Sequence, residues 1–290
     1  MPGVEDRVVV VTGSGGGLGR EYALALAREG AKVVVNDLGG ARDGSGSGTN
    51  MADSVVEEIK AAGGIAIANY DSVATEEGGK AIIETAIAEF GAIHGVINNA
   101  GILRDVSFGK MTTAEWDAVL KVHLYGAYNV SRAAWPHFRE QKYGRIAMAT
   151  STSGIYGNFG QANYGAAKLG LVGLANVLAI EGRKYNIGVN SLAPIAATRM
   201  TADVIDEERL NSLPPAFVAP VMVQLMSEDC KDTANVFVVG GGMVQRVAYF
   251  QSTAVNFAEP PSFGDIVAKW DDITNLDGAV PAGHPIRPNQ

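Results

Sequence analysis

The chain has 290 residues, of which 47% are hydrophobic and 19% charged, a composition that fits one large α/β domain and excludes a mainly disordered chain. Its formal net charge of −8, without any run rich in Lys and Arg, argues against a nucleic-acid partner or a membrane surface. The single cysteine, Cys230, excludes an intramolecular disulfide and a cysteine-based metal cluster, so we expect no metal site.

The sequence shows no targeting signal that we can identify. Residues 1–7 lack the basic stretch and apolar run of a secretory signal, and Pro288–Gln290 are not the usual peroxisomal tripeptide. No window reaches about 18 uncharged apolar residues, so no membrane-spanning helix is predicted. A cytoplasmic protein is therefore the expectation.

Short apolar runs alternate with helical patterns along the N-terminal two-thirds of the chain. The strand candidates are Val8–Val11, Lys32–Asn36, Ile65–Asn69, Ile93–Asn98, Arg145–Thr150, Gly188–Leu192 and Asn235–Val239. The helix candidates are Leu18–Glu29, Met51–Ala62, Thr75–Phe90, Thr113–Glu140 and Ala162–Lys184. Most strand candidates are apolar throughout, as in a parallel sheet buried on both faces. This order predicts a doubly wound α/β domain with one seven-stranded sheet.

Two stretches break the alternation. Leu38–Asn50 contains five glycines and two serines, and it is either a flexible surface loop or a cover for a bound ligand. After Gly240 the pattern becomes irregular and rich in proline. We expect a domain over residues 1–245 and an extension over 246–290 that packs on the domain or forms an oligomer contact. The final ten residues are expected to be disordered.

The first apolar run leads into a glycine-rich turn and the start of a helix. A dinucleotide pyrophosphate must approach backbone N–H groups at a helix N-terminus, and a Cβ on the turn would block it. Glycines also make ordinary tight turns, but this turn follows the first strand and opens a helix, as such a site requires. The spacing is TGxxxGxG, and the expected cofactor-binding residues here are Gly13, Ser14, Gly17, Leu18 and Gly19.

Polar and small residues follow the next three strands, at the edge where ligands bind in open α/β sheets. Asp37 can accept hydrogen bonds from the adenosine ribose and would repel a 2′-phosphate, which favours NAD over NADP; the alternative is an aspartate that caps a loop. Small and amide side chains suit close contact with adenosine, although Asn-Asn-Ala-Gly alone would be a plain turn. The further candidates are Asp71, Ser72, Asn99, Ala100 and Gly101.

The candidate reacting groups are a serine, a tyrosine and a lysine. Tyr164 and Lys168 stand at i and i+4, on one face of a helix, and Ser151 follows the fifth strand candidate. Interconverting an alcohol and a ketone needs one group that accepts or donates a proton at the oxygen. A nearby ammonium would favour the phenolate of Tyr164, Ser151 can hold the substrate oxygen, and Lys168 can also hold the nicotinamide ribose. A YxxxK pattern alone arises by chance; together with the preceding motifs it does not.

These residues resemble the short-chain dehydrogenase/reductase family over about residues 1–245. The motifs that carry the resemblance are Thr12–Gly19, Asn98–Gly101, Ser151, Tyr164 and Lys168. The resemblance implies a Rossmann fold with a seven-stranded parallel sheet, and a homodimer or homotetramer.

A closer likeness is to the (3R)-hydroxyacyl-CoA dehydrogenase unit of peroxisomal multifunctional enzyme type 2, also called 17β-hydroxysteroid dehydrogenase type 4. It rests on Val35–Gly40, Asn69–Val73, Asn99–Asp105, Ser153–Tyr164 and Glu181–Tyr185. The likeness implies a stand-alone dehydrogenase without the hydratase and sterol-carrier domains of that enzyme.

Two positions depart from the usual family pattern. His123 stands where the family usually has an asparagine that supports a proton relay, and it is either part of such a relay or a core histidine. After the sixth strand the usual Pro-Gly is Pro194-Ile195. The family implies that Pro194, Ala196 and Thr198 line the nicotinamide, with Thr198 at the carboxamide.

The expected activity is NAD-dependent oxidation of a secondary alcohol, namely a (3R)-hydroxyacyl-CoA thioester in fatty-acid or sterol side-chain β-oxidation. The alternative substrate is a 17β-hydroxysteroid or another hydrophobic alcohol, because the segment Ile195–Leu213 that would cover it has apolar residues suited to either. An alternative of another class is a non-catalytic NAD-binding sensor or structural subunit. Such a protein usually lacks the Tyr or the Lys, and both are present.

Overall fold

The computed structural model describes residues 3–197 and 212–283. The chain forms two compact units, Met1–Gln245 and Arg246–Gln290. The predicted site residues fall in the first unit, apart from Thr198, which lies outside the described residues.

The first unit is built on a sheet whose strands follow the order β3-β2-β1-β4-β5-β6-β7-β8 in the described part of the chain. Its parallel strands are β1 (Val8–Thr12), β2 (Lys32–Asn36), β3 (Ile65–Asn69), β4 (Gly95–Asn98), β5 (Gly144–Ala149), β6 (Ile187–Pro194) and β7 (Val236–Gly240). The order reverses next to β1, between its neighbours β2 and β4, as in a doubly wound sheet. The predicted Rossmann architecture is therefore confirmed.

An eighth strand, β8 (Met243–Val247), was not expected. It follows β7 after Gly241 and Gly242, whose φ angles are +56° and +81°. Two consecutive residues with positive φ form the tight turn that suits a β-hairpin, and only glycine adopts them without strain. Four of its five residues are exposed and Val247 is half-buried, so the strand lacks the apolar run that marked the other seven strands.

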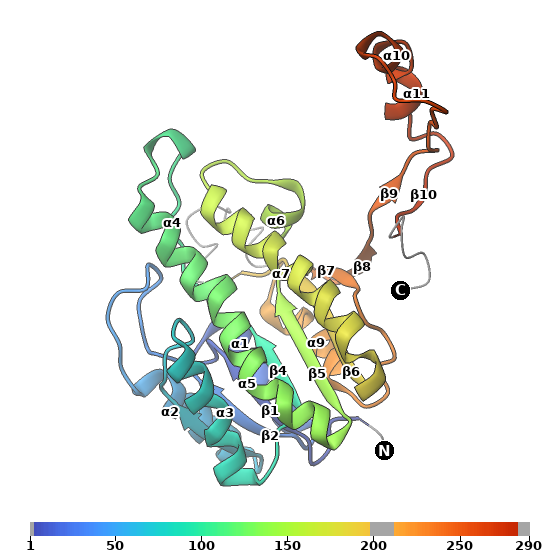
Figure 1. Cartoon of the computed structure of the whole chain (residues 1–290). Coiled ribbons are helices and arrows are strands. Elements are labelled where there is room, and N and C mark those ends of the chain that lie inside the picture. The colour runs from blue at the N-terminus through green and yellow to red at the C-terminus, as the bar shows by residue number, and fades with distance from the viewer. Residues whose placement is uncertain (1–2, 198–211, 284–290) are drawn as a thin grey trace. The chain divides into compact units, whose positions relative to one another are not determined.

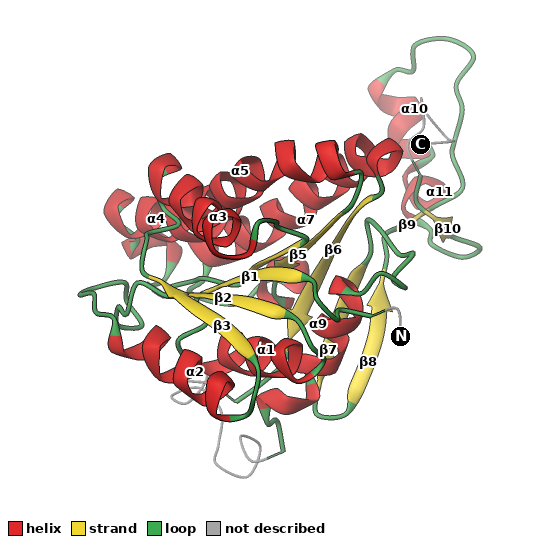
Figure 2. Ribbon diagram, turned by 90° about the horizontal axis from the view of Figure 1, so that it is seen from below, coloured by secondary structure: helices red, strands yellow, loops and turns green. Residues whose placement is uncertain are grey.

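Helices cover both faces of this sheet (Figure 2). On one face lie α1 (Gly17–Arg28), α2 (Asn50–Ala61) and α9 (Ala219–Met226). On the other lie α3 (Glu76–Phe90), α4 (Thr113–Leu120), α5 (Gly126–Gln141) and α7 (Ala162–Gly182). The short helix α6 (Thr152–Tyr156) precedes α7, as Figure 1 shows. Single helical turns add Phe108–Lys110, Arg183–Tyr185 and Pro215–Phe217.

The long helix predicted over 113–140 is interrupted. Between α4 and α5 the backbone forms a π-helical turn, Lys121–Tyr125, with His123 at its centre. Such turns insert an extra residue into an α-helix and are frequent at functional sites. A hydrophobic period does not reveal this insertion, because the helix continues on both sides.

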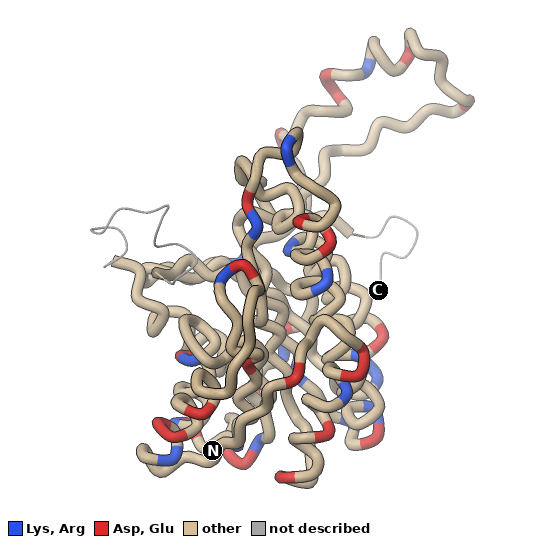
Figure 3. Tube along the Cα trace, turned by 90° about the vertical axis from the view of Figure 1, so that its left-hand side faces the viewer, with Lys and Arg blue, Asp and Glu red and all other residues tan. Residues whose placement is uncertain are grey.

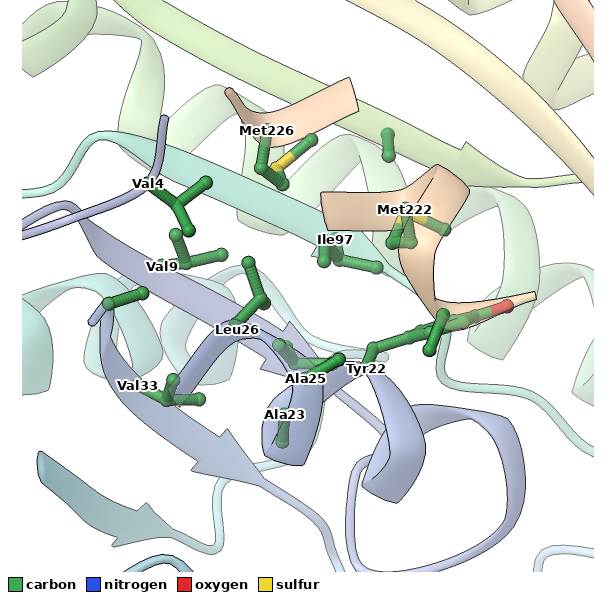
Figure 4. Packing of buried hydrophobic residues seen from close by; sticks show 14 of the residues in the cluster. Val4, Val9, Tyr22, Ala23, Ala25, Leu26, Val33, Ile97, Met222 and Met226 are labelled. Atoms are coloured by element: carbon green, nitrogen blue, oxygen red, sulfur yellow. The ribbon is translucent and has the colours of Figure 1, made fainter. Parts of the chain in front are cut away.

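Two buried clusters hold the layers together, one on each face of the sheet. In the cluster of Figure 4, Tyr22 and Leu26 of α1 pack with Val9 of β1 and with Met222 and Met226 of α9. Burying a side chain of this size contributes about 1.5–3 kcal/mol. The packing fixes α1 against β1, the two elements that the glycine-rich turn joins.

Helix α7 has an unusual composition for a surface layer. Together with the turn that follows it, as Ala162–Tyr185, it is long and apolar enough to cross a membrane by those two criteria alone. However, Leu171, Ala175 and Ala179 lie in the second buried cluster, and Lys168 is also buried. These contacts are those of a core helix in an α/β domain.

Charged side chains on the first unit are mixed in sign. Figure 3 shows basic and acidic residues interspersed along its helices. Typical pairs are Arg20 with Glu58 at 2.6 Å and Lys80 with Glu84 at 3.4 Å. Exposed pairs of this kind contribute about 0–1 kcal/mol each, so they are not what holds the domain together.

The second unit is small and has no buried residue over its described part, 246–283. It contains a two-stranded antiparallel ribbon of β9 (Phe250–Gln251) and β10 (Val280–Pro281), and the short helices α10 (Phe263–Ala268) and α11 (Trp270–Thr274). Pro281 pairs with Phe250 in this ribbon, and the disorder expected for the last residues stays a prediction. Residues 284–290 lie outside the described residues.

Candidate active site

Both the backbone conformation and the close packing of the glycine-rich turn after β1 exclude side chains from it. Gly13 and Gly17 have φ angles of +65° and +54°. A Cβ on Gly13 would lie 2.7 Å from the Cα of Ala100, and one on Gly19 would lie 2.3 Å from the carbonyl oxygen of Gly13. The fold itself therefore requires glycine at these positions, whether or not a ligand binds there. Helix α1 begins here without a side-chain cap, which leaves its first amides available to an anion.

Thr12 and Asn99 join this turn to the end of β4. The Thr12 hydroxyl accepts hydrogen bonds from the amides of Asn99 and Ala100, at 3.0 and 3.1 Å. In the other direction, Nδ2 of Asn99 donates to the carbonyl oxygens of Thr12 and Gly13, at 3.0 and 3.1 Å. The Asn99 side chain thus shapes the turn, while Asn99 also lines the cleft described below.

Ser14 is fully buried, its hydroxyl donates to the carbonyl oxygen of Val11 at 2.7 Å, and its amide donates to that of Asn36 at 2.9 Å. Both donors are engaged within the protein. Ser14 thus supports the turn through these two bonds, and its predicted contact with the cofactor stays a prediction.

Asp37 lies at the end of β2, beside the turn. One carboxylate oxygen accepts from the amide of Gly15 and the other from that of Gly39, each at 2.8 Å. A carboxylate offers about four acceptor positions, so these two bonds orient it and leave capacity for a hydroxyl ligand. Asp37 thus caps the loop, as the alternative held, and also faces the cleft.

A cleft of about 210 Å³ runs along the carboxyl ends of the central strands. Ten of the predicted cofactor residues line it: Gly13, Gly17, Leu18, Gly19, Asp37, Asp71, Ser72, Asn99, Ala100 and Gly101. Half of the remaining lining comes from the glycine-rich loop, through Leu38, Gly40, Ala41, Arg42 and Gly44. Of the two interpretations of this loop, the structure favours a cover for the cleft.

Ser151, Tyr164 and Lys168 come together where β5 ends and α7 begins. Ser151 caps the N-terminus of α6, and its hydroxyl accepts from the amide of Ser153 at 3.1 Å. Nζ of Lys168 donates to the carbonyl oxygen of Ala149 at 2.5 Å and lies 5.5 Å from the centre of the Tyr164 ring. The three side chains that the sequence placed in one site therefore share one site.

The pKa values of this group follow from burial. Burial raises the pKa of Tyr164, and a hydrogen bond with Ser151 opposes that rise. Burial lowers the pKa of Lys168 to about 7. We expected the ammonium to lower the pKa of the phenol, but in the protein alone desolvation has the larger effect.

His123 packs directly behind the tyrosine. Its ring is nearly perpendicular to that of Tyr164, and its Nε2 lies 2.8 Å from the carbonyl oxygen of Ile102 and 3.1 Å from the Ile102 amide nitrogen. Burial and the charge of Lys168 lower the pKa of His123 well below its usual value, so the ring is neutral. Its Nδ1 is buried and has no hydrogen-bond partner among the described residues. A role in a proton relay stays a prediction, and the observed contacts are those of a packed ring.

The residues after β6 are placed only in part. Pro194 ends β6, and Ala196 is buried; neither lines the cleft. Thr198, predicted to bind the carboxamide, lies outside the described residues, as do Met200 and Leu210 of the predicted substrate cover.

Sequence reasoning missed one polar residue of the site, Asn163. It is fully buried beside Tyr164, and its side chain bonds to three backbone groups. Its position immediately before the tyrosine was the available signal, but only the fold shows which segments it joins.

The model of the short chain dehydrogenase family matches residues 7–209. The chain belongs to the short-chain dehydrogenase/reductase family. A short-chain type dehydrogenase/reductase of Mycobacterium tuberculosis is 68% identical, over 98% of this chain and 99% of that protein. Peroxisomal multifunctional enzyme type 2 of Mus musculus is 54% identical over 95% of this chain but only 37% of its own length. The chain therefore spans about a third of that relative.

Solved structures agree with this family assignment. A short chain dehydrogenase from Mycobacterium avium matches with a TM-score of 0.83 and 40% identity, over 96% of this chain and 97% of that one. A 7α-hydroxysteroid dehydrogenase in complex with NADH and 7-oxoglycochenodeoxycholic acid matches with a TM-score of 0.74 and 26% identity, over 82% and 94%. As a member of this family, the chain is an oxidoreductase.

Proposed function

We propose that this protein is an NAD-dependent dehydrogenase that oxidises (3R)-hydroxyacyl-CoA thioesters to 3-ketoacyl-CoA. The observation that carries the proposal is the convergence of Ser151, Tyr164 and Lys168 after β5, in the sheet whose strand ends also form the cleft that Asp37 borders. The non-catalytic alternative is disfavoured, because a sensor has no need for an oriented phenol beside a buried ammonium.

The cleft fits the dinucleotide in two respects. The uncapped start of α1 offers amides to a pyrophosphate, and glycines leave the approach open. The carboxylate of Asp37 would accept hydrogen bonds from the ribose hydroxyls and repel a 2′-phosphate, so NAD is preferred to NADP. When bound, NAD supplies the acceptor for the hydride that leaves the carbinol carbon and a positive ring that favours the phenolate.

The protein residues then handle the proton. The phenolate of Tyr164 removes the hydroxyl proton of the substrate, while Ser151 holds the same oxygen by a hydrogen bond. Lys168 stabilises the phenolate by its charge and is held in place by Ala149. Because these groups are preorganised by β5, α6 and α7, they keep their geometry when the substrate binds.

The substrate class rests on the likeness to the multifunctional-enzyme branch, whose mouse member is 54% identical to this chain. A hydrophobic steroid alcohol is the second candidate, favoured by the structural match to a hydroxysteroid dehydrogenase at lower identity. We further propose that the enzyme acts as a homodimer or homotetramer in the cytoplasm.

Replacing Tyr164 tests the catalytic assignment. The Tyr164→Phe variant should lose about 10²–10⁴-fold in kcat with NAD and a (3R)-hydroxyacyl-CoA, because the proton acceptor is gone. Tyr156→Phe is the matched control, since Tyr156 is an exposed tyrosine of α6 and should turn over like the wild type. Equal rates for wild type and Tyr164→Phe would refute the catalytic role.

A further inference from the structure

Asn163 is a buried polar residue that the mechanism above does not use. It is the second residue of α7, with 0% of its surface exposed. Its Oδ1 accepts from the amide of Tyr164 at 2.7 Å. Its Nδ2 donates to the carbonyl oxygens of Arg104 and Glu115, at 3.1 and 3.2 Å. The side chain thus ties the backbone of Tyr164 to the segment after β4 and to α4.

The same segment after β4 also contacts the loop after β2 that covers the cleft. The amide of Leu103 donates to the carbonyl oxygen of Arg42, and Nε of Arg104 donates to that of Asp43, each at 3.0 Å. A Cβ on Gly44 would lie 3.1 Å from the side chain of Ile102, so loop and segment are in close contact. Arg104 therefore bonds to the loop through its side chain and to Asn163 through its carbonyl.

Three hydrogen bonds form a continuous path from the loop over the cleft to the backbone of the tyrosine. The path begins in the loop that lines the cleft, passes through residues 102–104 and ends at the Tyr164 amide. The first amides of a helix lack partners within the helix, so Asn163 supplies one to Tyr164 and limits its backbone movement. A misplacement of about 1 Å at a reacting group can reduce the rate about 10²-fold.

We propose that Asn163 is a positioning residue that transmits ordering of the 38–48 loop over the cofactor to the phenol of Tyr164. The inference rests on the proposed NAD site, but it does not depend on which alcohol is the substrate. Binding of the cofactor beneath the loop fixes residues 102–104, and Asn163 passes that restraint to the start of α7.

Hydrogen–deuterium exchange of the whole chain, with and without NADH, tests this path. In the wild type, NADH should slow exchange in residues 38–48 and also in residues 158–165. In Asn163→Ala the loop should still be protected by NADH, whereas residues 158–165 should gain no protection. Arg104→Met removes the bond to Asp43 and leaves the buried side chain of Asn163 in place. In this variant the protection of residues 38–48 and that of residues 158–165 should both weaken.

Two outcomes of this experiment have different meanings. Protection of residues 158–165 by NADH in Asn163→Ala to the same extent as in the wild type would overturn the role of Asn163. Absence of any protection of residues 38–48 in the wild type would instead refute the proposed cofactor site.

Kinetics supply a second readout on the intact enzyme. Asn163→Ala should lower kcat about 10- to 100-fold while KM and the NADH dissociation constant change less than about twofold. The double variant with Arg104→Met should be no slower than Asn163→Ala alone, because both lie on one path. Multiplicative losses in the double variant would contradict a shared path.

Asn190→Ala is the matched control for the loss of a buried amide. Asn190 in β6 is 1% exposed, donates to the carbonyl oxygen of Asp232 at 2.8 Å and accepts from the amide of Asn235 at 3.1 Å. Its partners Asp232 and Asn235 precede β7, so they lie at the amino ends of the parallel strands, whereas the cleft lies at the carboxyl ends. The Asn190→Ala variant should lower the melting temperature as much as Asn163→Ala does, but it should leave kcat within about twofold of the wild type. A loss of kcat in Asn190→Ala equal to that in Asn163→Ala would show that Asn163 acts only through stability.

Discussion

The imidazole of His123 stands edge-on to the phenol of Tyr164, with ring centroids 5.1 Å apart and ring planes at 88°. The arrangement is the edge-to-face geometry that aromatic pairs prefer. On its other side the imidazole meets the backbone of Gly101, where a Cβ would lie 2.2 Å from Cε1. His123 is therefore held between the Asn98–Gly101 turn and the proposed proton acceptor.

This contact predicts a large effect for Gly101→Ala. The added methyl must displace the His123 ring, which in turn presses on Tyr164, so we expect a loss of about 1–3 kcal/mol in the free energy of unfolding and a lower kcat. Denaturant unfolding and steady-state kinetics measure both. Gly173→Ala on α7 is the control, because a Cβ there meets nothing within 4 Å and should stabilise the helix by about 0.5–1 kcal/mol. Equal behaviour of the two variants would contradict the packing argument.

Lys168 should carry activity at the expense of stability. Burial lowers the pKa of its ammonium from 10.5 to about 7, so between these pH values only the unfolded chain binds the proton. Its contribution to the free energy of unfolding therefore rises as the pH increases from 7 towards 10.5. Lys168→Met should abolish this rise and be at least as stable as the wild type at pH 7, with kcat lower by about 10²-fold or more. Urea unfolding midpoints of the wild type and the variant, measured across this pH range, test this prediction. If the midpoint of Lys168→Met rises with pH as much as that of the wild type, Lys168 is not the cause of the rise.

Asp37 should determine the choice of cofactor. Asp37→Ser removes the carboxylate that would repel a 2′-phosphate, so the ratio of kcat/KM for NAD to that for NADP should fall by about tenfold or more. Because Asp37 also accepts from the amides of Gly15 and Gly39, NAD binding should weaken as well. A wild type that prefers NADP, or a variant with an unchanged ratio, would show that the carboxylate does not discriminate.

The lowered pKa values of two histidines predict that the protein loses stability in mild acid. Burial, with nearby positive charges, lowers the pKa of both His94 and His123, so the folded protein keeps them neutral. The unfolded chain binds these protons near pH 6.5, and the free energy of unfolding should therefore decrease as the pH falls below that value. His94→Asn should reduce this dependence, because an amide oxygen can replace the Nδ1 that accepts from the Val8 amide. An identical acid dependence in the variant would exclude His94 as a contributor.

The parts of the fold that were predictable share one property, a local pattern that the tertiary structure keeps. The apolar runs became the seven parallel strands, and the TGxxxGxG turn and the YxxxK helix lie where those patterns placed them. Such patterns persist because burial on both faces and helix-terminus geometry leave few alternatives.

The features that escaped prediction depend on contacts between distant segments. The π-helical turn at His123 does not alter the hydrophobic period, and β8 is an exposed strand specified by its Gly241-Gly242 turn. Ser14 carries a hydroxyl that suits a phosphate, but the fold buries it against Val11. The link through Asn163 exists only because the loop after β2 folds onto the segment after β4.

The most direct test of the proposed activity is the rate of NADH formation with a medium-chain (3R)-hydroxyacyl-CoA, its (3S) isomer and 17β-estradiol, measured in parallel. We predict rapid turnover of the (3R) thioester alone. Preference for the steroid or for the (3S) isomer, or no turnover of any of the three, would contradict the assigned substrate.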